Sequence, residues 1–314
     1  MNIIASLGPV FVLLMGGYLL KRTGFPGDSF WPSAERFIYF ICFPALLLTR
    51  LAEARFEGQL ALDLVWVILM LLVAGALLLL LLQKLNGFTG PVFTSVFQGG
   101  IRFNTYIALA IAAGILPGQG VVYAAIIASV MIPLINVFCV LVFATYQDNR
   151  PSPARVLLNI VQNPLILSCI LGLILNLSGV VLPDIVGEVL SLLAEIALPL
   201  GLLAVGAALQ IKTLRSTGLP LLTALLFRLL VMPMLAIASA SAMQLPLEAT
   251  QILLVFAAVP SATASYILAR QLGGDAPLMA AILSGQTLVA MLSLPLVLAF
   301  GVSIYPHLLS AIYG

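Results

Sequence analysis

The stretch ALDLVWVILMLLVAGALLLLLL at residues 61–82 decides the fold class, because its 22 residues carry a single charge, Asp63. About 20 consecutive apolar residues are needed for a helix to cross a bilayer. Within lipid the backbone must satisfy its own hydrogen bonds, and an unbroken apolar run lacks the alternation of a β-barrel strand. The stretch therefore predicts a transmembrane helix, with Asp63 near the membrane surface.

The rest of the chain repeats this pattern. Of its 314 residues, 62% are hydrophobic and 8% are charged, whereas soluble domains carry about 25% charged residues. Short polar connections separate ten apolar runs, so we predict an all-α membrane protein with ten transmembrane helices. The runs lie near residues 3–20, 33–50, 61–82, 89–114, 119–146, 157–177, 186–209, 219–242, 248–270 and 278–300.

The cations between these runs predict an orientation. With the N-terminus outside, the inner connections hold seven cations and the outer ones hold two, which matches the excess of positive charge found on the cytoplasmic side. The inner set is Lys21, Arg22, Lys84, Arg150, Arg155, Lys212 and Arg215, and the outer set is Arg50 and Arg55. The first four residues contain no basic segment, so we expect no cleaved signal peptide. Both termini are predicted on the outer side of the cytoplasmic membrane.

Two halves of the chain share a spacing of special residues. The pairs that match at an offset of 155 are Pro9 with Pro164, Gly17 with Gly172, Gly24 with Gly179, Pro44 with Pro199, and Gly118 with Gly273. Each half holds five predicted helices, and an odd number places the second half upside down in the membrane. We predict a first repeat at 1–146, a cytoplasmic linker at 147–156 and an inverted second repeat at 157–314. Inverted repeats are typical of secondary transporters.

The fourth and ninth runs are interrupted at similar depth. The first interruption is Gln98-Gly99-Gly100-Ile101-Arg102-Phe103-Asn104-Thr105-Tyr106, and the second is Val259-Pro260-Ser261-Ala262-Thr263-Ala264-Ser265-Tyr266. Proline and paired glycines weaken a helix, and broken helices in corresponding positions point to a transport site. Half-helix N-termini carry partial positive charge and free N–H groups that suit a carboxylate. The candidate substrate-binding residues are Arg102, Asn104, Thr105, Tyr106, Pro260, Ser261, Thr263, Ser265 and Gln286.

Other polar residues in the runs have simpler interpretations. An arginine in mid-membrane must face protein or a water-filled cavity, so Arg102 is either a structural partner or an attractor of anions. Glu195 and Arg228 lie on consecutive helices, and we interpret them as structural charges that could pair. Arg270 ends the ninth run and is expected to reach the membrane surface. The three cysteines, Cys42, Cys139 and Cys169, lie in apolar runs and are expected to be small core residues.

Composition and motifs argue against several function classes. The chain lacks the basic patch of a nucleic-acid-binding protein, and its cysteines show no metal-ligand spacing, so no cofactor, metal or nucleic-acid partner is predicted. An intramembrane protease needs a Ser–His dyad, two aspartates or a zinc site. The only histidine, His307, lies near the outer end of the last run. We therefore do not expect an enzyme.

The ninth run and the residues after it resemble the auxin efflux carrier family. The resemblance is carried by Asn104-Thr105 with Leu109, by the stretch from Pro260 to Asp275, PSATASYILARQLGGD, and by Ser284-Gly285-Gln286-Thr287-Leu288. It implies a scaffold of helices 1, 2, 6 and 7, and a mobile transport domain of helices 3–5 and 8–10. It also implies crossing of helices 4 and 9, an elevator-type motion, a homodimer, and small organic anions as substrates. Bacterial members of the family are described as malate or malonate permeases.

The chain departs from the family pattern at two positions. Members often have glycine before the Asn-Thr pair and proline after the following leucine, where this chain has Phe103 and Ala110. The plant members' long central loop is also absent here.

Three hypotheses of function remain open. One is potential-driven efflux of organic anions. A second is a sodium-coupled symporter, in which Gln98, Ser261 and Thr263, with Gln286, hold the ion. A third is a membrane sensor that binds a ligand without moving it.

Overall fold

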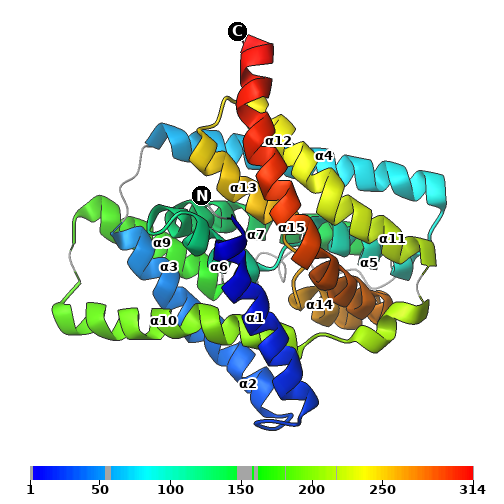
Figure 1. The fold of residues 1–314 in the computed structure, drawn as a ribbon, viewed down its shortest axis with the longest axis horizontal. Helices are drawn as coiled ribbons and strands as arrows, with labels where there is room; N and C mark the ends of the chain where they lie inside the picture. The colour runs from blue at the N-terminus through cyan, green and yellow to red at the C-terminus, as the bar shows by residue number, and fades with distance from the viewer. Residues whose placement is uncertain are drawn as a thin grey trace.

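The computed structural model describes residues 3–53, 58–146, 158, 162–180, 182–216 and 218–313. The predicted linker 147–156, with Arg150 and Arg155, lies outside the described residues, and so does Arg55. Within these ranges the chain is helical and contains no strand (Figure 1), which confirms the all-α class.

Helices occupy each of the ten predicted ranges. Before the linker they are α1 (Ile3–Arg22), α2 (Phe30–Phe37), η1 (Ile38–Cys42), α3 (Phe43–Ala52), α4 (Gly58–Asn86), α5 (Gly90–Ile101), α6 (Thr105–Ile115) and α7 (Gln119–Tyr146). After it they are α9 (Pro164–Ser178), α10 (Asp184–Ala207), η2 (Ile211–Ser216), α11 (Gly218–Leu226), η3 (Phe227–Val231), α12 (Met232–Ala242), α13 (Leu247–Ala258), α14 (Ala264–Leu272) and α15 (Ala276–Tyr313).

Among the described residues, five helical stretches are long and apolar enough to cross a membrane on their own. They are Gly58–Asn86, Gln119–Tyr146, Asp184–Ala207, Gly218–Ala242 and Ala276–Ser310. The last one continues well past residue 300, where the prediction ended. Side chains on the outside of the bundle are apolar, such as Leu177 and Ile185, which are 76% and 78% exposed. An apolar exterior of this extent is compatible with lipid rather than water.

Two helices contain a wide π-type turn ahead of a proline. In η1 the Phe43 N–H bonds the carbonyl of Ile38, and Pro44 follows. In η3 the Met232 N–H bonds the carbonyl of Phe227, and Pro233 follows. Proline cannot donate the next helical hydrogen bond, so the extra residue lets the helix continue past it. Pro199, which matches Pro44 in the second half of the chain, lies inside the continuous helix α10.

Helices α1 and α10 pack with their backbones in contact. A Cβ atom at Gly17 would lie 1.9 Å from the carbonyl oxygen of Leu203, and one at Gly206 would lie 1.9 Å from that of Leu14. Small residues allow this close approach of membrane helices.

The loop after α1 is held by Lys21 Nζ, which is 2.6 Å from Asp28 Oδ1. The lysine lowers the pKa of that exposed carboxyl.

The helices form two groups by their contacts. Helices α1, α2, α3, α9 and α10 pack on one another, and α4, α5, α7 and α11–α15 form a second group, as Figure 1 shows. Helix α6 contacts both groups, through α1 and α10 on one side and α7 and α13 on the other.

Cys42, Cys139 and Cys169 are buried and form no disulfide, which confirms the prediction that they are core residues.

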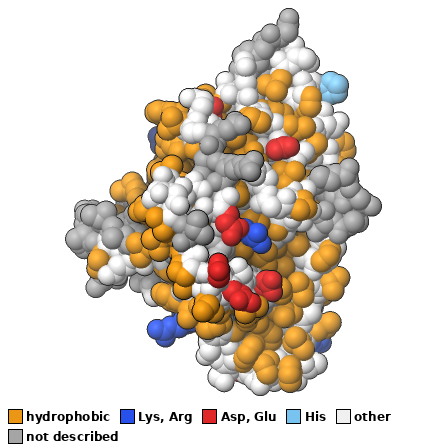
Figure 2. Space-filling view, turned by 90° about the vertical axis from the view of Figure 1, so that its left-hand side faces the viewer, with side chains coloured by type: hydrophobic (Ala, Val, Ile, Leu, Met, Phe, Trp, Pro, Cys, Tyr) orange, Lys and Arg blue, Asp and Glu red, His pale blue; other side chains and the backbone are white. Residues whose placement is uncertain are grey.

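On the face shown in Figure 2, acidic side chains gather on a largely hydrophobic surface. A cavity of about 620 Å³ between the ends of α3, α9 and α10 is lined by Glu53, Asp184 and Glu188. These acids lie outside the predicted site.

Candidate functional site

The fourth predicted helix is broken at Arg102–Asn104. Helix α5 ends at Ile101 and α6 begins at Thr105, with extended backbone at Arg102 and Asn104 between them. The Asn104 Oδ1 atom accepts hydrogen bonds from the backbone N–H groups of Tyr106 and Ile107, at 3.1 and 3.2 Å. Asparagine is among the best residues for this capping role, so the sequence itself restarts the helix at this point.

The ninth predicted helix is broken at residues 259–263. Helix α13 ends at Ala258 and α14 begins at Ala264, and Val259 is extended. The backbone N–H of Asn104 donates to the carbonyl of Pro260 at 2.7 Å. The two breaks are therefore in direct contact, and we call this region the crossover.

A fully buried arginine joins the C-terminal ends of the two half-helices. Arg228, on η3, has no exposed side-chain surface. Its Nε donates to the carbonyl of Val259 at 2.7 Å, its Nη1 to that of Ile101 at 3.4 Å, and its Nη2 to that of Phe256. These carbonyls end α13 and α5, where helix dipoles concentrate negative charge.

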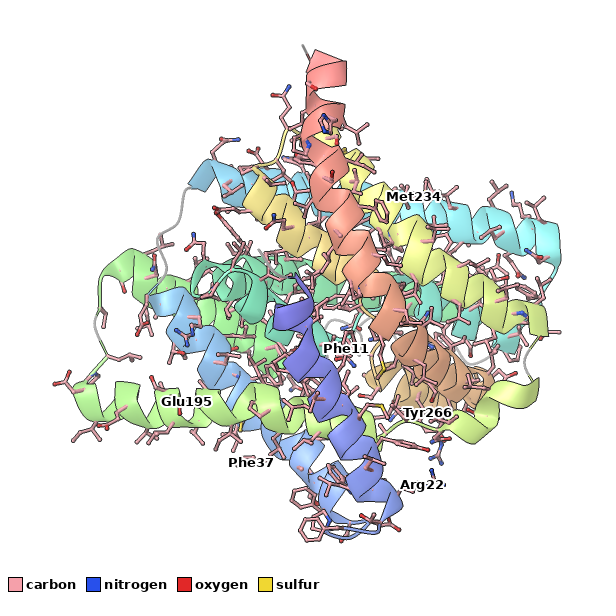
Figure 3. All side chains as sticks on the ribbon, viewed as in Figure 1. Phe11, Arg22, Phe37, Glu195, Met234 and Tyr266 are labelled. Carbon is pink, nitrogen blue, oxygen red and sulfur yellow. The ribbon has the colours of Figure 1, made fainter. Side chains whose placement is uncertain are left out.

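Arg228 does not pair with Glu195, the carboxylate that the sequence offered as a possible partner. Glu195 is exposed on α10, and Figure 3 shows it far from Met234 on α12, the helix that continues from Arg228. The arginine instead finds its counter-charge in backbone carbonyls. Helix dipoles at the crossover thus replace the carboxylate that the sequence suggested.

Part of the predicted site lies behind the crossover. Gln286 Oε1 accepts from the Ser261 N–H at 2.9 Å, and its Nε2 donates to the carbonyls of Gly99 and Ala224 at 2.8 and 3.0 Å. Ser261 Oγ lies 3.1 Å from Ser265 Oγ. Ser261, Ser265 and Gln286 are buried, and these contacts fasten the second break to α5, α11 and α15. Pro260 is buried as well and contributes its carbonyl.

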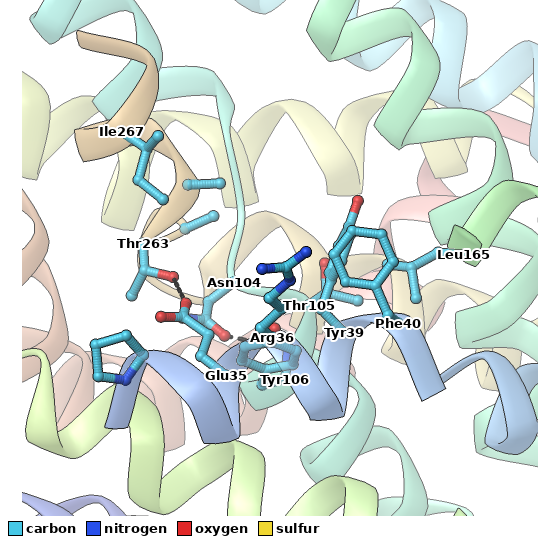
Figure 4. A pocket seen from close by; sticks show the side chains of 13 residues that line it. Glu35, Arg36, Tyr39, Phe40, Asn104, Thr105, Tyr106, Leu165, Thr263 and Ile267 are labelled. Atoms are coloured by element: carbon cyan, nitrogen blue, oxygen red, sulfur yellow. Dashed lines mark hydrogen bonds between the residues drawn. The ribbon is translucent and has the colours of Figure 1, made fainter. Parts of the chain in front are cut away.

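Four of the other predicted residues line an open cavity of about 370 Å³. Asn104, Thr105 and Tyr106 reach it from the first break, and Thr263 from the second. The opposite wall comes from α2 and η1, which contribute Glu35, Arg36, Tyr39 and Phe40 (Figure 4). Tyr106 stacks on Phe43, with ring centroids 4.6 Å apart. We call this space the crossover cavity.

Arg102 lines a smaller neighbouring cavity of about 110 Å³, together with Asn136 and Asn163. Its Nη2 donates to Asn136 Oδ1 at 2.5 Å. Its Nη1 is buried and has no hydrogen-bond partner among the described residues. One terminal nitrogen of the guanidinium is therefore held in place, and the other has an unused hydrogen-bond donor.

Sequence reasoning missed the polar residues that face the breaks from other helices. These are Glu35, Arg36 and Tyr39 on the second helix, Asn136 on α7, and Asn163 before α9. A Glu-Arg pair at the start of an otherwise apolar run was a usable signal for the first group. Asn163 precedes Pro164 and caps α9, which is a helix-start pattern that the sequence displays. No pattern marked Asn136.

The electrostatics of the crossover cavity favour an anion. The N-termini of α6 and α14 open at its wall, and each helix N-terminus carries about half a positive charge. Arg36 lines the cavity as well and Arg102 lies next to it, while Glu35 opposes them. The described residues hold no group of three His, Cys, Asp or Glu side chains that could bind a metal.

Comparison with known proteins bears on this geometry. Residues 147–298 match the model of the family described as membrane transport protein. A protein of Methanothermobacter thermautotrophicus named as an uncharacterized transporter is 26% identical over 290 residues, which cover 91% of this chain and 94% of that protein. Both matches point to a transporter rather than an enzyme. They agree with the resemblance to the auxin efflux carrier family, and the chain is a multi-pass membrane transporter that is similar to members of that family.

Proposed function

We propose that the chain moves small organic anions across the cytoplasmic membrane of a bacterium. The observation that carries the proposal is the crossover cavity, where the N-termini of α6 and α14 open side by side. Together they supply about one positive charge, which suits one carboxylate group. Asn104, Thr105 and Thr263 add polar groups at the same wall.

The proposed substrates are carboxylates such as malate, malonate or auxin-like acids. The cavity holds about 370 Å³ and is lined elsewhere by apolar residues, among them Phe40, Leu165 and Ile267. Ligand sites of this size bind through apolar walls with a few polar groups that fix orientation. This lining favours a carboxylate that carries an apolar body.

An elevator motion is proposed for the transport step. The group α1–α3, α9 and α10 would be the scaffold, shared by a homodimer, and the remaining helices would carry the substrate. Two inverted repeats with outward termini fit this arrangement, in which each repeat supplies one broken helix. An inside-negative potential favours exit of an anion by about 2.3 kcal/mol per charge per 100 mV, so efflux would need no other ion.

Flux in proteoliposomes tests the proposal. Radiolabelled malate and indole-3-acetate are loaded, and efflux is measured with and without an imposed potential. We expect potential-dependent efflux of at least one probe, lost in Asn104→Ala and reduced in Arg102→Ala, and retained in the control Glu195→Gln. Unchanged flux in both site variants would falsify the site.

One observation supports a sodium-coupled symporter as the second candidate. The side chain of Gln98 is fully buried, and neither its Oε1 nor its Nε2 has a hydrogen-bond partner among the described residues. The backbone carbonyl oxygen of Gln98 lies 3.4 Å from Ser261 Oγ. Oxygen ligands for a small cation are therefore close together at this point. An inward sodium gradient that accelerates uptake of either probe would favour this candidate.

The third hypothesis, a sensor without flux, shares the same cavity. Counterflow separates it from a transporter, because exchange of labelled for unlabelled probe requires the site to open on both sides. Saturable binding without counterflow would support the sensor.

A further inference from the structure

A carboxylate already occupies the candidate anion site. Thr263 Oγ1 donates a hydrogen bond of 2.6 Å to Glu35 Oε1 across the crossover cavity, as Figure 4 shows. The two residues are 228 positions apart in sequence and lie on α2 and in the second break. A negative charge at this wall opposes the half-helix N-termini's preference for a substrate anion, so its position needs a physical reason.

We propose that the Glu35 carboxylate is a resident substitute for the substrate carboxylate at Thr263, and that an entering anion displaces it. The inference rests on the proposed function. Both carboxylates compete for the same hydroxyl donor and for the same positive half-helix ends. Two like charges within a few ångströms repel strongly when water is partly excluded, so only one of them occupies this position at a time.

The surroundings of Glu35 leave it free to move. Among the described residues, the one ion pair within 4.0 Å joins Lys21 to Asp28, so the lysine that shares a neighbouring cavity with Glu35 is engaged elsewhere. Arg36, the next residue, forms no ion pair with Glu35 either. Its guanidinium lies 6.0 Å from the centroid of the Phe40 ring. Glu35 is half-buried and is held to the crossover by one hydrogen bond to a hydroxyl.

Displacement of Glu35 has a mechanical consequence. The Glu35–Thr263 hydrogen bond connects α2, in the first helix group, to the second break, in the other group. An anion that takes over Thr263 removes this connection. Substrate binding would therefore release the crossover from α2 before the two groups move relative to each other.

The first test measures binding. Indole-3-acetate is titrated by calorimetry into the purified full-length protein in nanodiscs, and Glu35→Gln keeps the size of the side chain while removing its charge. We expect the dissociation constant to fall about tenfold, which corresponds to about 1.4 kcal/mol. The exposed Glu195→Gln is the matched control and is expected to bind as the unaltered chain does. Unchanged or weaker binding by Glu35→Gln overturns the proposal, because removal of a carboxylate that competes with the anion must tighten binding.

The second test needs no substrate. Nitroxide labels at Ser33→Cys on α2 and Gln271→Cys on α14, both exposed positions, report the distance between the two elements by double electron–electron resonance. We expect Glu35→Ala and Thr263→Val, which remove opposite ends of the same hydrogen bond, to broaden the distance distribution in the same way, while Glu195→Gln leaves it unchanged. Distributions identical to that of the parent labelled chain would overturn the proposal.

The two tests separate failure of this proposal from failure of the proposed function. If indole-3-acetate and malate both fail to bind while Glu35→Ala and Thr263→Val broaden the distribution, the hydrogen bond connects the groups but the anion assignment is wrong. If a probe binds and the distribution does not respond to either substitution, the anion assignment stands and the role of Glu35 is refuted.

Discussion

Replacement of Arg228 by methionine tests the physical basis of the crossover. The arginine is fully buried and donates to three backbone carbonyls at the ends of two half-helices. Each helix C-terminus carries about half a negative charge, so the two ends together match the single charge of the guanidinium. Methionine has a similar length and no donor, and it leaves these carbonyls without a partner in an apolar interior.

The expected loss of stability follows from these contacts. A hydrogen bond from a charged donor contributes about 1.5 kcal/mol or more, so three of them contribute about 4–5 kcal/mol. Burial of the charge opposes this by a few kcal/mol, and methionine recovers part of that cost. We expect a net loss of about 3 kcal/mol for Arg228→Met. Arg228→Lys keeps the charge but not the planar fork, and it should lose about half as much.

Chemical unfolding in detergent micelles measures these differences. Arg22→Met is the matched control, because Arg22 is exposed at the end of α1, and exposed substitutions usually change stability by less than about 0.5 kcal/mol. A small cation should also fill the cavity left by Arg228→Ala. Millimolar methylguanidinium is therefore expected to raise the melting temperature of Arg228→Ala and to leave that of the parent chain unchanged. If Arg228→Met is as stable as Arg22→Met, the charge-balance explanation is refuted.

Three further predictions test the site and its support. Asn104→Asp keeps the helix cap but adds a negative charge to the crossover cavity, so this variant should fold normally and lose anion binding. Asn104→Ser should retain both normal folding and anion binding. Equal anion binding by the two variants would contradict the anion site. Gly206→Ala should destabilise the chain by more than about 2 kcal/mol, because the added methyl group would lie 1.9 Å from the Leu14 carbonyl oxygen. Gly187 has open space around it, so Gly187→Ala should be neutral or stabilising by up to about 1 kcal/mol. Thermal unfolding compares the two variants. Gln286→Leu should cost about 2–3 kcal/mol through three lost hydrogen bonds, and an unfolding curve like that of the parent chain would show that this fastening is dispensable.

The sequence predicted the helices well because lipid imposes a simple rule. Every spanning segment must be apolar and internally hydrogen-bonded, so long apolar runs such as 61–82 identify helices without knowledge of their neighbours. The breaks at Asn104 and Pro260 were predictable for a similar reason. Capping by asparagine and the missing donor of proline are local backbone effects, which require no tertiary contact.

The site was only partly predictable because membrane helices show little difference between their buried and lipid-facing sides. Apolar residues cover both sides, so the periodicity that identifies the buried face of a soluble helix is weak. The sequence therefore grouped Gln286 and Ser265 with Thr263, although the first two are packed behind the crossover and only Thr263 faces the cavity. It also offered Glu195 as a possible partner of Arg228, because a carboxylate is the partner that charge alone suggests.

The amino-acid sequence by itself determined the apolar helices, the two interruptions and the resemblance to a transporter family, since all three depend on the composition and order of neighbouring residues. Only the tertiary structure decided that Arg228 binds the carbonyls ending two half-helices, and that Glu35 meets Thr263 in the cavity between them. These partners are distant in sequence, and their contact depends on how the helices pack. Packing brings backbone dipoles and side chains together at one point, which no local pattern encodes.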